Sequence, residues 1–190
     1  MGVDFLKTLI AIKSAFESGD LKWALIGGLA VGVHGIPRTT IDIDILVDIE
    51  ALPALDAALL GIGYSLEYRW DESSHFLQPT GMGLTPIDAL HAHRIHSMNM
   101  LKRALPRSFG SDEHIFPVVQ AEDLVGLKIQ ALCNDHEREA HEIADVRSIF
   151  EVAVEKQSPL DGERINEYFS LFGRMDLLKR LLEGLDDAIQ

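Results

Sequence analysis

The sequence predicts an α/β protein of the α+β kind, in which a β-sheet with flanking helices is followed by a purely helical part. Over residues 1–119, apolar runs of strand length alternate with apolar residues at helical spacing. From residue 122 onward, the periodic stretches have helical spacing. We therefore expect a core over residues 1–119 and a helical subdomain over residues 120–190.

The composition is that of an ordinary globular protein. A chain of 190 residues with 47% hydrophobic and 25% charged residues suits one domain, or a core with a modest appendage. No apolar run reaches the length of a membrane span and the N-terminal residues lack a basic leader, so we expect a cytoplasmic protein without a membrane partner. The single cysteine, Cys133, excludes an intramolecular disulfide, and we expect it to be a buried structural thiol.

The formal net charge of −13 argues against a protein that follows nucleic-acid backbones, because such binding requires a basic surface. An acidic chain can still bind a small nucleotide locally. Mg²⁺ would screen the triphosphate, together with basic side chains such as Arg38 and Lys128. Small nucleotides are therefore favoured over long nucleic-acid polymers, and we expect no extended nucleic-acid surface.

The chain begins with a helix and a short strand. Apolar residues at helical spacing predict an amphipathic helix over residues 4–17. Residues 24–26 form an apolar run of strand length. Gly27 and Gly28 follow it and allow a sharp turn of the backbone without a Cβ penalty.

A second helix and a second strand follow the glycine turn. Residues 29–34 make about two helical turns before Pro37, which disfavours helical geometry at the residue before it. Residues 39–47 are rich in β-branched side chains and predict a strand. Because successive side chains on a strand point to opposite faces, Asp42 and Asp44 are expected to share one face.

Two carboxylates on one face predict a metal site. Side chains two residues apart can lean together and bind a pair of divalent ions that lie about 3.5 to 4 Å apart. Oxygen ligands suit Mg²⁺, with Mn²⁺ as a possible substitute. The alternative is that Asp42 and Asp44 are the solvated side of an edge strand, but strands are depleted in Asp, which favours the metal site.

These residues together resemble the signature of the nucleotidyltransferase superfamily related to DNA polymerase β. The likeness is greatest to the double-glycine branch, which includes AbiEii-type toxin nucleotidyltransferases and some aminoglycoside and lincosamide nucleotidyltransferases. The signature residues are Gly27-Gly28-Leu29-Ala30, Gly35, Arg38, Thr40 and Asp42-Ile43-Asp44-Ile45. The resemblance implies a small mixed β-sheet core flanked by helices, with its first two strands side by side, and a C-terminal helical appendage.

The resemblance also implies an activity and a set of acids. A nucleoside monophosphate would pass from a triphosphate to an acceptor hydroxyl, with release of pyrophosphate, and two Mg²⁺ ions would be held by Asp42 and Asp44. A third acid is expected on a neighbouring strand in a hydrophobic-Asp-hydrophobic context, which Asp88 matches. Glu67 and Asp71 compete for that role, and a polar strand end is the structural alternative for Asp88.

The nucleotide-binding residues that the resemblance implies lie in the same stretch. Gly27 and Gly28 would let backbone N–H groups approach the phosphates. Arg38 would bind a phosphate or hold the carboxylates in place, and Thr40 belongs to the same set. Many relatives carry a serine at the position of Gly28. In those proteins the serine hydroxyl contacts the terminal phosphate.

The rest of the core is expected to contain one helix, several strands and two turns. Helical spacing predicts a helix over residues 50–60. The predicted strands are residues 64–70, 74–77, 84–90 and 115–119, with turns at residues 71–72 and 80–83. Residues 98–109 are basic for this protein and are expected to be an exposed loop or a helix that edges the substrate cleft.

A cluster of histidines near Asp88 raises the alternative of a zinc site. His91, His93 and His96 follow that residue closely. However, no cysteine lies nearby and the sequence has neither an HExxH helix nor a paired-cysteine pattern. We therefore expect exposed loop histidines.

The helical part contains further candidate site residues. Residues 122–134 and 136–146 resemble segments that follow the core in the AbiEii-like branch. By that resemblance, Lys128 would neutralise triphosphate charge, and Asp145 would be an accessory residue that orients Lys128 or the acceptor. The alternative is a surface lysine and a surface acid on amphipathic helices.

Two more helices, separated at Gly173, are expected over residues 162–190. Their leucines would pack on the core or form the seam of a homodimer.

Two other functions are compatible with the sequence. The first is a non-catalytic nucleotide-binding or antitoxin-like module with the same fold, although a site without turnover has no reason to keep Asp42, Asp44 and Asp88 together. The second is a DxD glycosyltransferase, which does not require the double glycine upstream. The acceptor hydroxyl stays open among RNA, protein and small molecules.

Overall fold

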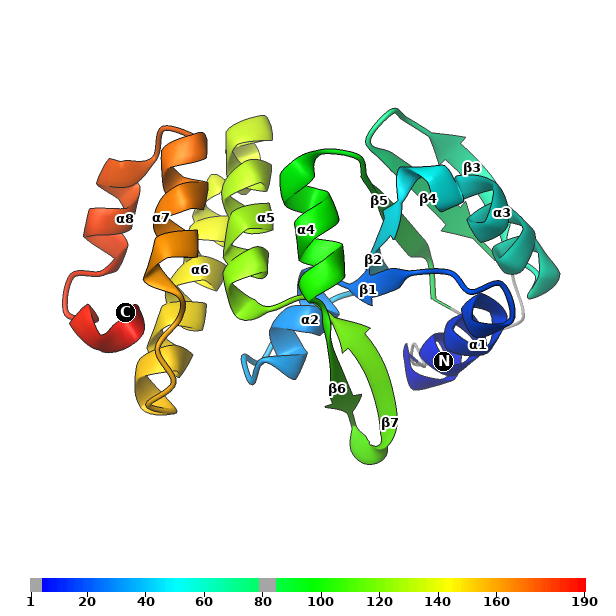
Figure 1. Ribbon diagram of the computed structural model, residues 1–190, viewed down its shortest axis with the longest axis horizontal. Coiled ribbons are helices and arrows are strands. Elements are labelled where there is room, and N and C mark those ends of the chain that lie inside the picture. The colour runs from blue at the N-terminus through cyan, green and yellow to red at the C-terminus, as the bar shows by residue number, and fades with distance from the viewer. Residues whose placement is uncertain (1–4, 79–84) are drawn as a thin grey trace. The chain divides into compact units, whose positions relative to one another are not determined.

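A computed structural model describes residues 5–78 and 85–190 of the protein, shown in Figure 1. The described residues belong to two compact units, the first within residues 1–33 and 38–119 and the second formed by residues 34–37 and 120–190. The first unit contains a seven-stranded mixed sheet with helices, and the second contains helices. The predicted α/β fold class is therefore confirmed. The turn predicted at residues 80–83 lies outside the described residues.

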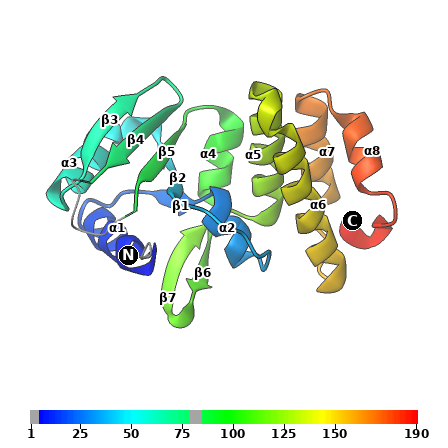
Figure 2. The same cartoon turned by 180° about the vertical axis from the view of Figure 1, so that it is seen from behind.

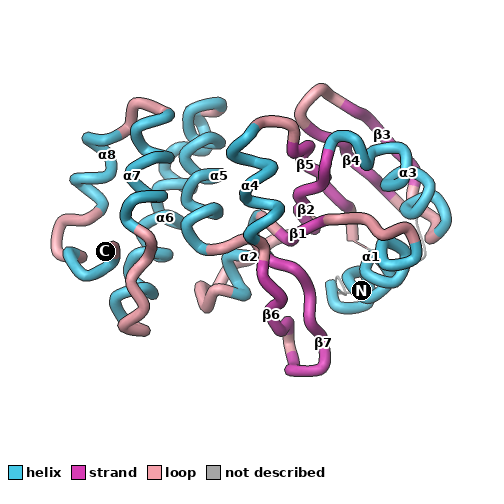
Figure 3. Tube along the Cα trace, in the orientation of Figure 1, coloured by secondary structure: helices cyan, strands magenta, loops and turns pink. Residues whose placement is uncertain are grey.

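The sheet brings strands from both ends of the first unit together. Its strands are β1 (Trp23–Leu25), β2 (Ile43–Asp48), β3 (Ser65–Arg69), β4 (Ser73–Leu77), β5 (Ile87–Ala92), β6 (Leu105–Phe109) and β7 (Ser111–Val118). Their order is β3-β4-β5-β2-β1-β7-β6, and they are drawn in magenta in Figure 3. β1 lies beside β2, as expected, and is antiparallel to it. β2 is parallel to β5, and β1 is parallel to β7.

The helices of the first unit are α1 (Phe5–Ser18), α2 (Gly27–Val33), α3 (Leu52–Gly61) and α4 (Ile95–Arg103). Thr8, Leu9, Ile12 and Phe16 are buried, which is the stripe that helical spacing predicts for α1. α1 contacts α3, and α4 contacts β2 and β5. Figure 2 shows α2 beside β1 and the β6–β7 hairpin, in agreement with its contacts to β2 and β6.

The second strand starts later than the sequence pattern predicts. β2 begins at Ile43, so residues 39–42 lie before the strand and Ile41 is exposed. The Oγ1 of Thr40 donates a hydrogen bond to the Oδ1 of Asp42 over 2.7 Å, a local bond that competes with strand pairing. Asp42 therefore lies directly before the strand that carries Asp44.

The basic stretch at residues 98–109 is neither an exposed loop nor one long helix. It forms the end of α4 and then the edge strand β6, which pairs with β7 in a hairpin. Gly110 closes the hairpin with φ +74°, a conformation that glycine adopts without steric cost. Pro106 of β6 faces Pro117 of β7 in this hairpin, and proline is tolerated on β6 because β6 is the last strand in the order of the described sheet.

The second unit contains α5 (Ala121–Asn134), α6 (Glu139–Glu155), α7 (Gly162–Leu171) and α8 (Met175–Leu181). α5 packs on α7, where a Cβ on Gly126 would lie 2.9 Å from ring atoms of Tyr168. The Tyr168 hydroxyl donates to the Oδ1 of the buried Asp123 over 2.7 Å. The break between α7 and α8 falls at Gly173, as expected. Leu177, Leu178 and Leu181 are buried in this unit, so they are not available for a dimer seam.

A buried tyrosine predicts a specific weakness at alkaline pH. The Tyr64 hydroxyl donates to the Thr85 carbonyl over 2.6 Å, and burial raises the pKa of Tyr64 to about 12. The unfolded chain releases this proton near its ordinary pKa of about 10. Stability is therefore present below pH 10 and is lost as the pH rises towards 12. Between about pH 10 and 12, urea unfolding should show wild type losing about 2 kcal/mol more than Tyr64→Phe. Parallel stability curves for the two proteins would contradict this expectation.

Candidate active site

Three carboxylates converge at the centre of the sheet. β2 and β5 run parallel in a register that places Asp44 beside Asp88. Asp42 lies just before β2, and oxygens of Asp42, Asp44 and Asp88 lie within 4.8 Å of one another. All three residues are half-buried. The structure thus brings the three predicted acids into one cluster.

Gly27 is required by the position of Asp44. The backbone of Gly27 has φ +62°, and a Cβ placed there would lie 1.9 Å from the Oδ2 of Asp44. The N–H of Ile26 donates to the Asp44 carbonyl over 3.0 Å, which holds the two chain segments together. Any residue other than glycine would therefore collide with this carboxylate.

Gly28 makes room for Thr40 in the same way. A Cβ on Gly28 would lie 2.8 Å from the Cβ of Thr40, whose hydroxyl binds Asp42. Thr40 was predicted as a nucleotide-binding residue, and its contact in the structure is with a carboxylate. Both glycines thus shape the acid cluster itself, while their approach to phosphates stays a prediction.

His75 is a site residue that the sequence did not indicate. Its Nδ1 lies 2.5 Å from the Oδ1 of Asp88, and its Nε2 lies 3.4 Å from the Oε2 of Glu67. Glu67 therefore lies next to the histidine and outside the three-acid cluster. The antiparallel pairing of β4 with β5 places His75 opposite Asp88, and no local sequence pattern marks that pairing.

The prediction that His91 is an exposed loop histidine is wrong. His91 is buried on β5, where its Nδ1 donates to the Asp71 carbonyl over 3.0 Å and its Nε2 lies 2.8 Å from the Ser74 hydroxyl. Burial lowers the pKa of His91, so the neutral ring is favoured. Both ring nitrogens have hydrogen-bond partners. Within residues 5–78 and 85–190, the one group of acids and histidines close enough to hold a metal is Asp42, Asp44 and Asp88.

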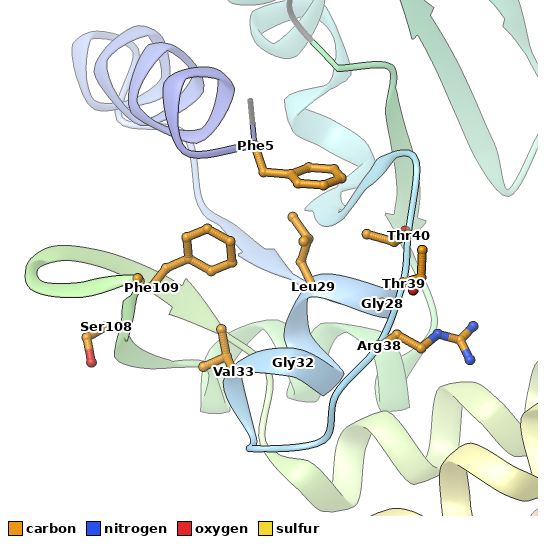
Figure 4. Close-up of a pocket in the computed structure, with 11 residues that line it drawn as sticks. Phe5, Gly28, Leu29, Gly32, Val33, Arg38, Thr39, Thr40, Ser108 and Phe109 are labelled. Carbon is orange, nitrogen blue, oxygen red and sulfur yellow. The ribbon is translucent and has the colours of Figure 1, made fainter. Parts of the chain in front are cut away.

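A cavity of about 600 Å³ lies in the first unit, beside the glycine turn (Figure 4). Three of the predicted nucleotide-binding residues, Gly28, Arg38 and Thr40, are part of its lining. Phe5 and Phe109 face Leu29 across it, whereas the guanidinium of Arg38 points away from these apolar side chains. The cavity thus has apolar walls and a polar side formed by the loop that leads to Asp42.

Lys128 and Asp145 lie together in the second unit. The Lys128 ammonium lies 2.7 Å from carboxylate oxygens of both Glu142 and Asp145, and Arg138 lies 3.0 Å from Glu142. Lys128, Glu142 and Asp145 are buried, so the alternative of a surface lysine and a surface acid is wrong. The proposed contact between Asp145 and Lys128 is present, and the role of Lys128 towards a triphosphate stays a prediction.

Removal of this buried lysine should strongly destabilise the protein. Lys128→Met leaves the buried carboxylates of Glu142 and Asp145 without their shared cation, which should cost about 3 kcal/mol of unfolding free energy. The matched control is Lys179→Met on the exposed surface of α8, which should change stability by less than about 0.5 kcal/mol. Chemical denaturation of both variants measures the difference. Equal stabilities would contradict a structural role for the buried lysine.

Cys133 is half-buried and not fully buried, which corrects the expectation of a buried thiol.

Among the described helices, none combines the length and the apolar composition required to cross a membrane.

The acid cluster fits a divalent metal. Carboxylate oxygens are the ligands that Mg²⁺ and Mn²⁺ favour. Oxygens bound to one Mg²⁺ lie at most about 4.2 Å apart, given metal–oxygen distances of about 2.1 Å. A cluster whose oxygens lie within 4.8 Å of one another can therefore take one ion after a small adjustment, or two ions that share ligands.

No family model and no curated protein matches the sequence. Solved structures do match. ANT(2″)-Ia in complex with adenylyl-2″-tobramycin is 14% identical, with 88% of this chain and 95% of that chain covered at a TM-score of 0.64. An antigenic nucleotidyltransferase-like protein from Paracoccidioides brasiliensis is 17% identical, with 100% and 96% covered at a TM-score of 0.61. A putative nucleotidyltransferase from Thermotoga maritima is 14% identical, with 72% and 90% covered at a TM-score of 0.54.

At these identities the comparisons establish the fold. The chain shares its fold with these nucleotidyltransferase structures, so the fold that the resemblance implied is confirmed. The narrower likeness to AbiEii-type toxins stays a prediction.

Proposed function

We propose that this protein is a metal-dependent nucleotidyltransferase that moves a nucleoside monophosphate from a triphosphate to an acceptor hydroxyl. The observation that carries the proposal is the cluster of Asp42, Asp44 and Asp88, with oxygens within 4.8 Å of one another. Gly27 and Gly28 leave no space for a side chain, because a Cβ on Gly27 would meet Asp44 and a Cβ on Gly28 would meet Thr40. The fold shared with ANT(2″)-Ia and other nucleotidyltransferase structures supports the same reaction.

The acids would divide the chemistry between them. Asp42 and Asp44 would hold two Mg²⁺ ions, or Mn²⁺ in their place, and Asp88 would complete the ion on the acceptor side. When bound, such ions neutralise charge on the triphosphate and on the attacking oxygen. The acceptor oxygen attacks the α-phosphorus, pyrophosphate leaves, and Asp88 takes the proton of the acceptor hydroxyl. Arg38 would bind a phosphate through its guanidinium.

We propose that the cavity beside the glycine turn receives the nucleoside. Its lining contains Gly28, Arg38 and Thr40 as well as the aromatic rings of Phe5 and Phe109. A volume of about 600 Å³ lies in the range typical of small-ligand sites. Aromatic side chains bind nucleobases by stacking without requiring a particular base.

The proposal also assigns a role to each of the two parts of the chain. Residues 1–119 would form the nucleotidyltransferase core and residues 120–190 the helical subdomain with Lys128 and Asp145. The two compact units support this boundary, except that residues 34–37 belong with the second unit, where the Lys156 ammonium donates to the His34 carbonyl over 2.9 Å. A cytoplasmic location and a homodimer complete the proposal, and sedimentation measures the oligomeric state.

The direct test is transfer of α-labelled nucleotide in the presence of Mg²⁺ or Mn²⁺. The acceptors to be offered are total RNA, the protein itself and small molecules with hydroxyl groups, aminoglycosides and lincosamides among them. Label transferred by wild type and absent with Asp44→Asn would support the enzyme. Nucleotide binding without a labelled acceptor would instead favour a non-catalytic nucleotide-binding or antitoxin-like module.

The cavity proposal predicts a separable effect on nucleotide affinity. Phe109→Ala removes one aromatic wall, so the KM for the triphosphate should rise about tenfold, as expected for a lost stacking contact. The kcat should stay within about twofold, because the ring would bind the ground state and transition state equally. Leu105→Ala is the control, since Leu105 lies on the same strand, is exposed and does not line the cavity. A wild-type KM in Phe109→Ala would place the nucleoside elsewhere.

A further inference from the structure

One face of the sheet carries a continuous row of side chains that leads from its edge to the acid cluster. Tyr68 of β3 pairs with His75 of β4, His75 pairs with Asp88 of β5, and Asp88 pairs with Asp44 of β2. Residues that face each other on neighbouring strands lie on the same face. The aromatic pair and the two acids therefore form one row across four adjacent strands.

The members of the row are in direct contact. The His75 ring stacks on the Tyr68 ring, with centroids 4.9 Å apart and an angle of 11° between the planes. The Nδ1–H of His75 donates to the Oδ1 of Asp88 over 2.5 Å. Only 17% of the His75 side chain is exposed, whereas Asp88 keeps 37% of its side chain exposed. The histidine is thus enclosed behind a carboxylate that stays accessible.

A β-bulge places a second acid behind the histidine. The pairing of β3 with β4 shifts between Leu66 and Tyr68, which leaves Glu67 as the extra residue. The Oε2 of Glu67 lies 3.4 Å from the Nε2 of His75. The ring therefore has a neighbour at each nitrogen and an aromatic ring on one face, so its orientation is fixed.

We propose that His75 is a positioning residue that fixes the rotation of the Asp88 carboxylate. A carboxylate turns easily about its Cβ–Cγ bond, and a hydrogen bond at Oδ1 stops that rotation and leaves Oδ2 for the ion and the acceptor proton. The inference rests on the proposed function, because it assigns His75 to the acid on the acceptor side. Hydrogen-bond partners of this kind typically change metal affinity or activity by about 10- to 100-fold.

The test compares His75→Leu, which removes the donor, with His75→Asn, whose amide nitrogen lies near the position of Nδ1. Binding of Mn²⁺ with a nonhydrolysable triphosphate, measured by electron paramagnetic resonance, should weaken about tenfold in His75→Leu. The kcat should fall about 10- to 100-fold, while the KM for the triphosphate stays within about twofold. His75→Asn should recover both quantities to within about threefold of wild type.

Two further variants separate the row from general effects. Tyr68→Phe keeps the stacked ring and should match wild type, whereas Tyr68→Ala should show part of the His75→Leu defect. His93→Leu removes an exposed histidine outside the row and should change nothing. Wild-type Mn²⁺ affinity and kcat in His75→Leu would overturn the proposal, and so would a His75→Asn variant as impaired as His75→Leu.

The two proposals fail in different ways. If wild type neither binds Mn²⁺ nor transfers nucleotide, the proposed function fails. Crystal structures of wild type and His75→Leu then test the positioning role alone. A carboxylate of Asp88 that turns away from its wild-type orientation in His75→Leu supports the role, and an unchanged orientation overturns it.

Discussion

Replacement of Asp44 by asparagine should abolish nucleotidyl transfer and leave the fold intact. The side chain keeps its size but loses the charge that holds divalent ions beside Asp42 and Asp88. The loss of several kcal/mol of transition-state stabilisation corresponds to a fall in kcat of about a thousandfold or more. The measurement is the transfer of α-labelled nucleotide at saturating metal and nucleotide.

The thermal stability of Asp44→Asn should not fall with its activity. Three carboxylates with oxygens within 4.8 Å repel one another in the absence of metal, so removal of one charge should leave the melting temperature equal or slightly higher. Asp48→Asn is the matched control, because Asp48 ends the same strand and an asparagine oxygen can still accept its bond from the Glu50 N–H. An unstable Asp44→Asn protein, or an Asp48→Asn protein without activity, would show that the acids serve the fold.

The centre of the site was predictable because its determinants are local in sequence. A strand, a glycine turn, a helix and a second strand occur between Trp23 and Asp48, and each has a recognisable pattern. Asp88 was recognisable because its apolar neighbours Ile87 and Ala89 are buried on either side of it in β5. Parallel pairing of β5 with β2 then brings the acids together.

The histidine contacts near the site depend on strand pairings that local sequence patterns do not reveal. His75 meets Asp88 because β4 and β5 pair in a register that places the two residues opposite each other, and a bulge in β3 leaves Glu67 near the same ring. His91 is buried because Ser74 of the neighbouring strand and the Asp71 carbonyl satisfy both of its nitrogens. The hydrogen-bond partners of His75 and His91 all lie more than ten residues away in sequence, so periodicity could not reveal these contacts.

Strand β6 of the β6–β7 hairpin was missed for a different reason, whereas the end of β7 lies within the strand predicted at residues 115–119. Pro106 disfavours a strand assignment, and the exposed residues of β6 remove the apolar alternation that marks strands. An edge strand tolerates both features, since its outer N–H groups need no partner in the sheet. The sequence pattern around Arg107 therefore indicated a loop or a helix, although these residues pair with β7.

Replacement of Gly27 by alanine should cost both stability and activity, and a matched glycine separates the causes. Gly173 has nearly the same backbone, φ +65° against +62° for Gly27, but a Cβ on Gly173 would meet nothing within 4 Å. Gly173→Ala should therefore show only the cost of the left-handed backbone, about 1 to 2 kcal/mol, with full transfer activity.

At Gly27 the added methyl group would meet the Asp44 side chain from Oδ2 down to its Cβ, which lies 2.6 Å away. Rotation of the carboxylate cannot relieve a contact with Cβ, so the backbones of the turn and of β2 must separate. We expect a total loss of about 2 to 5 kcal/mol in urea unfolding and a fall in transfer activity comparable to that of Asp44→Asn. The expectation fails if Gly27→Ala is as stable as Gly173→Ala and still transfers nucleotide. Asp44 would then have a second position that supports activity. Because the strain in the two backbones is alike, the difference between the two variants measures how tightly the glycine turn holds this carboxylate.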